Sequence, residues 1–195
     1  MLLRRGITLT ATLAVLLAAG CTSQDPEPEP PPVAQSPTPT VEPPEPTPTV
    51  APVVAPPPPP ELERTDEVGA AAAAEYFLEL YGYVMQTGDV AAWDALSWES
   101  CGFCSRTSGI ATEIADANEN FEGANITVTD TFVHPYDDLV GGYPVDVDFS
   151  QDEGTRRDAS GDLIEASQAD SGTIGVDVIH SDGGWKVVAV TAQDR

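Results

Sequence analysis

Basic residues are scarce in this sequence of 195 residues. Eight lysines and arginines stand against 32 aspartates and glutamates, so the formal net charge is −24, and Lys186 is the only lysine. A surface of this sign repels nucleic acid and anionic lipid, which makes both poor partner candidates. The same charge is typical of a solvated, soluble surface, although it could attract cations or a basic partner.

The first hydrophobic run is too short to cross a bilayer comfortably. It covers residues 7–19, whereas a membrane-spanning helix needs about 20 apolar residues. Arg4 and Arg5 precede the run and small residues follow it, which is the order of regions in a signal peptide. We therefore expect residues 1–20 to be a signal peptide and not an anchor helix.

The end of this segment, Leu17-Ala18-Ala19-Gly20-Cys21, resembles a bacterial lipobox. The resemblance implies lipidation of Cys21, typically with palmitate, and attachment to the extracytoplasmic face of the cell membrane. Two or more acyl chains make such an anchor stable, because each buried methylene contributes about 0.8 kcal/mol. An ordinary secretory signal followed by a chance cysteine is the alternative interpretation.

Residues 22–60 contain no aromatic residue and 17 of the 19 prolines. Such a segment buries too little apolar surface to offset its chain entropy, so we expect it to be disordered with polyproline II character. At about 3.1 Å per residue it could extend on the order of 120 Å. With the lipidated Cys21 it forms the predicted stalk, residues 21–60. The run Pro56–Pro60 could alternatively be a ligand for a proline-binding module.

Residues 61–195 have the composition of one globular domain. Apolar residues at helical spacing predict a long first helix over residues 65–86. A short helix carrying Trp93 and Leu96 should follow it. A third helical pattern covers residues 105–122 and places Phe121 on the same apolar stripe as Ile110 and Ile114.

After Gly123 the apolar period changes from helical spacing to two, which predicts antiparallel strands with one buried face. The strands expected from this alternation cover residues 126–132, 143–149, 174–178 and 185–189, with a short hairpin over residues 158–166. The predicted fold class is α+β, with three N-terminal helices packed on a curved antiparallel sheet of about four strands.

Three short motifs and their order resemble a known family. They are the step Thr87-Gly88-Asp89 between helices, Cys101-x-x-Cys104 before the third helix, and the closing segment Gly183-Gly184-Trp185-Lys186-Val187-Val188. With the lipobox and the proline-rich stalk, this layout is similar to uncharacterised actinobacterial lipoproteins with a nuclear transport factor 2-like, cystatin-like cone domain. The resemblance spans the whole chain and implies a fold and a location, but no activity.

Cys101-Gly102-Phe103-Cys104 is the sharpest local motif. Outside the cytoplasm two cysteines this close are expected to form a disulfide that fixes the turn between two helices. A thiol–disulfide oxidoreductase is the alternative, since a cysteine at a helix N-terminus has a lowered pKa. However, redox motifs of the thioredoxin type follow a strand, whereas Cys101 follows a helix.

Ligands for a metal or cofactor are also few. Zinc would need residues beyond the cysteine pair, and the sequence offers only His134 and His180, each at the end of a predicted strand. The acidic clusters near Asp146 and Asp158 do not follow the EF-hand order of calcium ligands, although weak calcium binding stays an alternative. We therefore expect no metal site and no cofactor.

No catalytic constellation can be assigned from the sequence. A pocket inside the cone could be lined by Tyr81, Trp185 and His180, and by Asp130, which shares the alternation phase of its apolar neighbours unless it marks a bulge. Three functions follow, in order of preference. The first is a non-enzymatic accessory domain that binds a cell-envelope protein or polymer, the second a small-molecule-binding or enzymatic cone pocket, and the third the oxidoreductase. The oligomeric state is not predictable from these features.

Overall fold

A computed structural model describes residues 52–193 of the chain. The predicted signal peptide, the lipidation site Cys21 and most of the predicted stalk lie outside the described residues. None of the described helices is long and apolar enough to cross a membrane.

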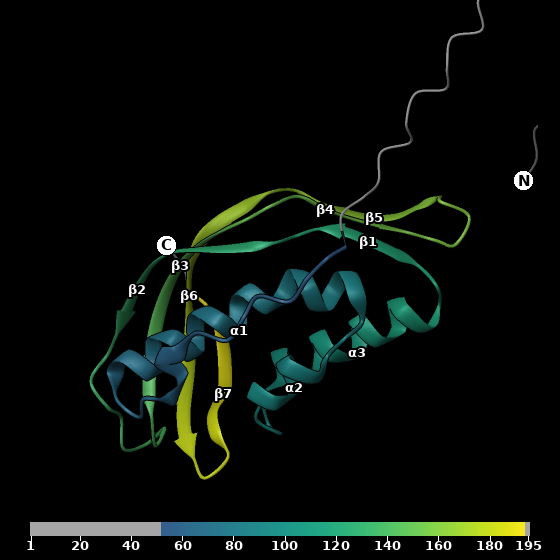
Figure 1. Cartoon of the computed structure of the whole chain (residues 1–195). Coiled ribbons are helices and arrows are strands. Elements are labelled where there is room, and N and C mark those ends of the chain that lie inside the picture. The colour runs from purple at the N-terminus through teal and green to yellow at the C-terminus, as the bar shows by residue number, and fades with distance from the viewer. Residues whose placement is uncertain (1–51, 194–195) are drawn as a thin grey trace, which may run out of the picture. The chain divides into compact units, whose positions relative to one another are not determined.

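Three α-helices follow a single turn of 3-10 helix, as the sequence predicts for the order of helices (Figure 1). The first, α1, begins after Asp66, whose side chain accepts a hydrogen bond from the Gly69 N–H, and ends at Gly88, which has a left-handed φ of 70°. Both ends thus carry standard cap residues. The helical elements are η1 (Pro60–Glu63), α1 (Glu67–Thr87), α2 (Ala91–Leu96) and α3 (Gly102–Asp116).

The strands form two antiparallel sheets, with the order β2-β3-β6-β7 in the larger and β1-β4-β5 in the smaller. The prediction of about four strands is therefore wrong for the described residues, which contain seven, although the larger sheet does have four. The strands are β1 (Asn120–Gly123), β2 (Ile126–Val133), β3 (Tyr143–Gln151), β4 (Gly154–Arg157), β5 (Leu163–Ser167), β6 (Asp170–Ser181) and β7 (Gly184–Ala192).

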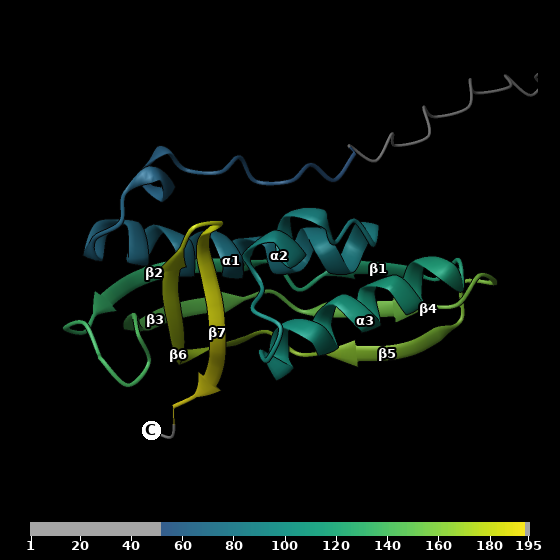
Figure 2. The same cartoon turned by 90° about the horizontal axis from the view of Figure 1, so that it is seen from below.

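The two sheets are continuous pieces of one bent strand array. The chain passes from one sheet to the other at three places, each within two residues: between β1 and β2, between β3 and β4, and between β5 and β6. At the first of these bends Gly123 and Ala124 both have positive φ, of 78° and 55°. Figures 1 and 2 show the resulting array curving over α1, and α3 packs against α1 and β7.

The core lies between α1 and the larger sheet. Phe77 and Trp93 are fully buried and stack with their ring centroids 4.0 Å apart. From the sheet, buried valines of β3, β6 and β7 face them: Val145, Val147, Val176, Val178 and Val187. At about 25 cal/mol per Å² of apolar surface, this cluster is the main source of stability.

The third helix is shorter than predicted. It ends at Asp116, and the expected continuation to residue 122 contains β1 instead. Asn118 has a left-handed φ of 53°, and the Glu119 N–H donates to the Ile114 carbonyl, so an αL cap ends the helix here. Phe121 consequently lies on a strand and not on the helical stripe.

The alternation in β2 is broken by a bulge. The register with β3 shifts between Val128 and Asp130, so the side chains change faces at this point. Asp130 and Phe132 are exposed, and Phe132 retains 61% of its accessible surface, whereas Thr131 lies toward α1. The sequence alternation places Phe132 in the same phase as Ile126 and Val128, on the core face. This expectation is wrong, and the bulge interpretation of Asp130 is the right one.

Candidate functional site

An apolar cavity of about 280 Å³ opens between α1, α3 and the concave face of the larger sheet. Its lining contains no charged residue, and we call it the apolar lobe. Helix residues close one side and strand residues the other. The lobe is lined by Leu78, Tyr81, Phe103, Ile126, Phe149, Gln151, Ile174, Val190 and Ala192.

A second cavity of about 200 Å³ adjoins it at Tyr81 and Gln151, which line both. This mixed lobe lies under the smaller sheet and contains the charged side chains Arg156 and Glu165. Its remaining lining residues are Met85, Ile110, Phe121, Ala124, Gly154 and Ser167. The sheet bend therefore creates one two-lobed site from residues that are far apart in sequence.

Tyr81 stands between the two lobes with its ring held by aromatic neighbours. It packs edge-on against Trp93 and parallel to Phe103, at centroid distances of 6.3 and 6.4 Å. Burial, and secondarily the charge of Glu165, raises the pKa of the Tyr81 phenol, so it stays a protonated donor. Within residues 52–193 this hydroxyl has no hydrogen-bond partner.

Two other polar side chains of the site, Gln151 and Arg156, are engaged through their nitrogen atoms. The Gln151 Nε2 donates to the Ala124 carbonyl over 3.2 Å, which ties β3 to the bend after β1. Arg156 donates to Glu119 and Glu113 at 2.5 and 3.3 Å, so its charge is neutralised within the protein. The site thus offers hydrogen bonding without a free positive charge.

The four residues expected to line a pocket are separated. Tyr81 does line the site. Trp185 is buried in the core, where its indole Nε1 donates to the Arg64 carbonyl over 2.8 Å. His180 is exposed and packs edge-on against Trp185, and Asp130 is exposed on the outer side of β2. Neither His180 nor Asp130 can therefore act as an acid or base inside the cone.

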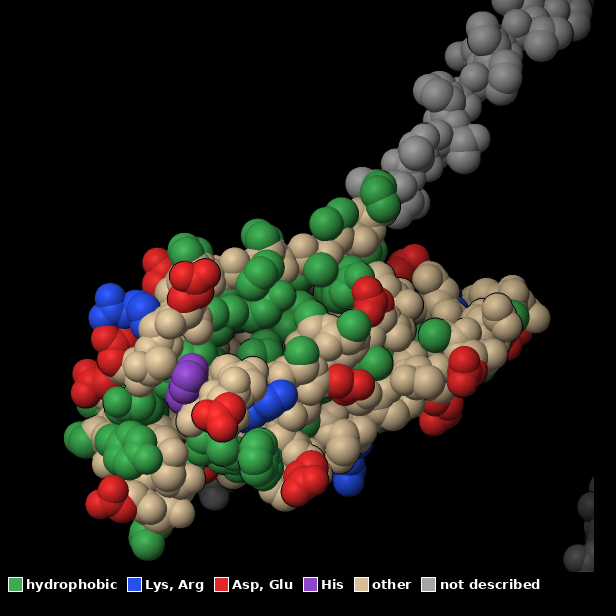
Figure 3. Space-filling model, turned by 60° about the horizontal axis from the view of Figure 1, so that its bottom comes forward, with side chains coloured by type: hydrophobic (Ala, Val, Ile, Leu, Met, Phe, Trp, Pro, Cys, Tyr) green, Lys and Arg blue, Asp and Glu red, His purple; other side chains and the backbone are tan. Residues whose placement is uncertain are grey.

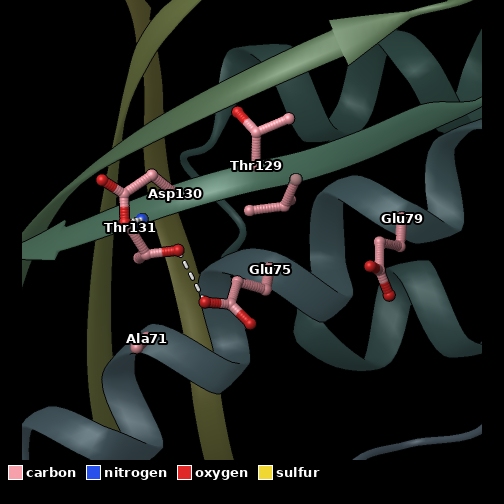
Figure 4. A pocket seen from close by; sticks show the side chains of 7 residues that line it. Ala71, Glu75, Glu79, Thr129, Asp130 and Thr131 are labelled. Atoms are coloured by element: carbon pink, nitrogen blue, oxygen red, sulfur yellow. Dashed lines mark hydrogen bonds between the residues drawn. The ribbon is translucent and has the colours of Figure 1, made fainter.

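Asp130 lines a different hollow, the open groove of about 380 Å³ between α1 and the edge strand β2. Figure 4 shows Thr131 on β2 pointing toward Glu75 on α1, whereas Thr129 and Asp130 point away from the helix. Thr131 Oγ1 donates to Glu75 Oε1 over 2.6 Å. Burial, together with the charge of Glu75, raises the pKa of Glu79. The charged side chains that line this groove are the acids Glu75, Glu79 and Asp130, and no lysine, arginine or histidine lines it beside them.

The outer face of the larger sheet brings together His134 and Asp146, which the sequence analysis considered only separately, as possible metal ligands. His134 Nε2 lies 2.8 Å from Asp146 Oδ2, and Gln193 bonds the other oxygen of Asp146. Burial, and then the charge of Asp137, raises the pKa of Asp177 beside them. His134 and His180 do not form a shared site. No group of three or more metal-ligating side chains occurs among residues 52–193.

A disulfide joins Cys101 and Cys104 at the start of α3. Both residues are only 1% exposed, and Cys101 Sγ accepts a hydrogen bond from the Cys104 N–H. Trp93 Nε1 donates to the Cys104 carbonyl over 3.0 Å and covers the pair. Thiol–disulfide exchange requires access to a sulfur, so this burial argues against the oxidoreductase.

Acidic side chains are spread over the surface, with few lysines or arginines among them, as the view in Figure 3 illustrates. This agrees with the sequence composition of 32 acidic and eight basic residues. Acidic residues also meet within the larger sheet, where Asp130 lies directly opposite Asp148 across the β2–β3 pair. The described surface shown there presents no basic patch that could hold a phosphate backbone.

Several solved structures resemble the chain at low identity. The intermembrane-space region of the chloroplast protein ARC6 has 13% identity and a TM-score of 0.49, and the match covers 67% of this chain and 99% of that one. Aln2 from a Streptomyces species has 10% identity and a TM-score of 0.40, with 66% and 92% covered. The beta subunit of a putative aromatic-ring-hydroxylating dioxygenase from Novosphingobium aromaticivorans has 11% identity and a TM-score of 0.41, with 65% and 92% covered.

These TM-scores lie below 0.5, so the likenesses support no inference about this chain. No curated protein matches it. A family model does match, over residues 48–191, which includes the disulfide and every lining residue of the two lobes except Ala192. The chain therefore belongs to the family of unknown function DUF6318.

Proposed function

We propose that this protein is a non-enzymatic, extracytoplasmic binding domain that a lipid on Cys21 tethers to the cell membrane. The sequence from Arg4 to Cys21 supports the tether through its resemblance to a lipobox. The proline-rich segment would hold the domain away from the membrane. The α+β architecture, with helices first and a bent antiparallel sheet after them, fits the nuclear transport factor 2-like cone expected of such lipoproteins.

The two-lobed cavity is the proposed binding site, and it is the observation that carries the proposal. It is concave, mostly apolar, and contains a few polar groups, which is the usual character of a small-molecule site. Phe77 and Trp185 are buried in the core and do not line the cavity, whereas Tyr81 lies in the wall of both lobes.

The lining of the apolar lobe contains no acid or base, since Glu165 lines the adjoining mixed lobe, and this favours binding over catalysis. The apolar lobe offers the Tyr81 hydroxyl and the Gln151 amide, neither of which is a general base at neutral pH. The candidates that sequence reasoning offered, Asp130 and His180, are exposed elsewhere. A binding site for a partner protein or an envelope polymer on the outer surface is a second candidate, supported by exposed Phe132, Tyr136 and Leu139 near the β2–β3 loop.

The tether is tested with the full chain in a bacterial host that processes lipoproteins. Cys21→Ala should abolish incorporation of a labelled palmitate analogue and should shift the protein out of the membrane fraction. The double variant Cys101→Ala/Cys104→Ala keeps Cys21 and should still incorporate the label. Label in the Cys21→Ala protein, or its absence from the wild type, would contradict the tether.

The cavity is tested by filling it. Ala192 lies exposed at the rim of the apolar lobe, so Ala192→Phe adds volume there without disturbing the core. This variant should weaken binding of the neutral dye Nile red by about tenfold or more, equivalent to about 1.4 kcal/mol. Ala159→Phe, in the exposed turn between β4 and β5, is the matched control. Equal binding by both variants would show that the dye binds elsewhere.

A further inference from the structure

The chemistry of the apolar lobe restricts which ligand it can take. None of its nine lining residues is charged. In the adjoining lobe Arg156 is neutralised by Glu119 and Glu113, and the second charged side chain, Glu165, is an acid that repels anions. An ion buried in the apolar lobe would lose its hydration without gaining a counter-charge. Anions face a further penalty, because the chain carries a net charge of −24. Charged ligands are therefore disfavoured, anions most of all.

Two polar groups of the same lobe, the Tyr81 hydroxyl and the Gln151 Oε1, have no hydrogen-bond partner among residues 52–193, and of these only the hydroxyl is a donor. The Gln151 Nε2 is engaged with the Ala124 carbonyl. The ring of Tyr81 is fixed between Trp93 and Phe103, so the direction of its hydroxyl is largely set. A ligand that displaces water from this hydroxyl must supply an acceptor or leave it unsatisfied.

We propose that the apolar lobe binds an uncharged lipophilic molecule bearing a carbonyl or ether oxygen, and that this oxygen accepts a hydrogen bond from Tyr81. Phe103, Phe149 and Ile174 surround the apolar part of the ligand. The inference rests on the proposed binding function and adds the ligand class. Size selection follows from the lobe volume of about 280 Å³, with room for further ligand atoms in the mixed lobe of about 200 Å³.

Three probes of one size separate the possible chemistries. 2-Acetonaphthone is uncharged and has a carbonyl acceptor, 2-ethylnaphthalene is uncharged and lacks one, and 2-naphthoate is an anion. Binding is measured by equilibrium dialysis on residues 22–195 without lipid, a chain that contains all of the described residues 52–193. We expect the ketone to bind at least about tenfold more tightly than the anion, because the lobe has no compensating charge.

Tyr81→Phe removes only the hydroxyl and tests the hydrogen bond. It should weaken binding of 2-acetonaphthone about three- to tenfold, the range for one hydrogen bond, and leave 2-ethylnaphthalene unchanged. Tyr136→Phe is the matched control, because Tyr136 is 54% exposed and lines neither lobe. Near-ultraviolet circular dichroism verifies that each variant is folded.

The outcomes distinguish the two proposals. If 2-naphthoate binds as tightly as the ketone, or if Tyr81→Phe weakens the ketone and the hydrocarbon equally, the ligand class is wrong while the cavity stays a binding site. If Tyr81→Phe changes nothing, the hydrogen bond is wrong. If none of the probes binds, or if Ala192→Phe leaves their binding unaltered, the cavity is not the binding site and the proposed function fails with it.

Discussion

At the scale of single residues, Cys101 and Cys104 show how a reactive sequence motif becomes a structural one. The pair follows α2 and begins α3, and the Trp93 indole bonds to the Cys104 carbonyl above it. Cys104 Sγ lies 3.8 Å from the Val187 carbonyl of β7, so the disulfide also packs against the sheet. Its sulfurs are covered from both sides. The structural role of the motif therefore follows from its neighbours in the fold and not from the spacing of the two cysteines.

Removal of this disulfide should cost little stability. The ring it closes is short, so it removes little entropy from the unfolded chain, and we expect Cys101→Ala/Cys104→Ala to lower the free energy of unfolding by about 1–2 kcal/mol. Urea denaturation of the oxidised wild type and the variant measures the difference. Rapid reduction of the native disulfide by dithiothreitol, faster than global unfolding, would contradict the burial and revive the oxidoreductase.

At the scale of elements, Gly69 allows the chain to enter α1. A Cβ on Gly69 would lie 2.2 Å from the Arg64 carbonyl oxygen, and that carbonyl is held by Trp185 Nε1. The first turn of the helix, the preceding segment and β7 therefore meet at a point where only a glycine fits. Gly109 in α3 is the opposite case, because a Cβ there meets nothing within 4 Å.

Substitution of these two glycines by alanine should change the free energy of unfolding in opposite directions. In an exposed helix interior alanine is favoured over glycine by about 0.5–1 kcal/mol, so Gly109→Ala should stabilise the domain by that amount. Gly69→Ala gains the same helix propensity but forces a backbone contact, and it should destabilise the domain by about 1–3 kcal/mol. Thermal and urea unfolding of both variants measure the signs. A stabilising Gly69→Ala would mean that the Arg64 carbonyl can move away without loss.

The elements also show which parts of the fold the sequence predicts. The order of helices, the α1 caps and the β6–β7 hairpin at Asp182-Gly183 follow from local signals, and each is observed. Two predictions failed, the end of α3 and the buried position of Phe132. Asn118 ends α3 through a left-handed conformation that asparagine tolerates, a signal present in the sequence. The acid at Asp130 signals the β2 bulge, but the change of face at Phe132 depends on pairing with β3, which the alternation alone does not give.

At the scale of the whole molecule, the candidate site depends on the bend between the two sheets. Gly123 has a φ of 78°, and a Cβ there would lie 2.1 Å from the Glu153 carbonyl oxygen, so the bend needs a glycine. The bend brings Phe121 and Glu165 over the residues of α1 to form the mixed lobe. Tyr81 was predictable as a pocket residue from its place on α1. The other lining residues were not, because they come from separate helices and strands joined only by tertiary packing.

The net charge of the whole molecule predicts how its melting temperature depends on salt. With −24 charges and like-charge neighbours such as Asp130 and Asp148, the folded state is destabilised by self-repulsion. Salt at about 0.1 M shortens the Debye length to about 10 Å and screens these contacts. The melting temperature should therefore rise with NaCl, by about 3 °C for each 1 kcal/mol gained.

Calcium at matched ionic strength provides the discriminating comparison. If the acids act only through their summed charge, CaCl₂ and MgCl₂ should raise the melting temperature alike and without saturation at low concentration, since each dication screens equally. A saturable additional rise in CaCl₂ alone would follow from a specific site, because ligand binding to the native state stabilises it by mass action. The residues 52–193 contain no group of three metal-ligating side chains, so we expect the two salts to act equally.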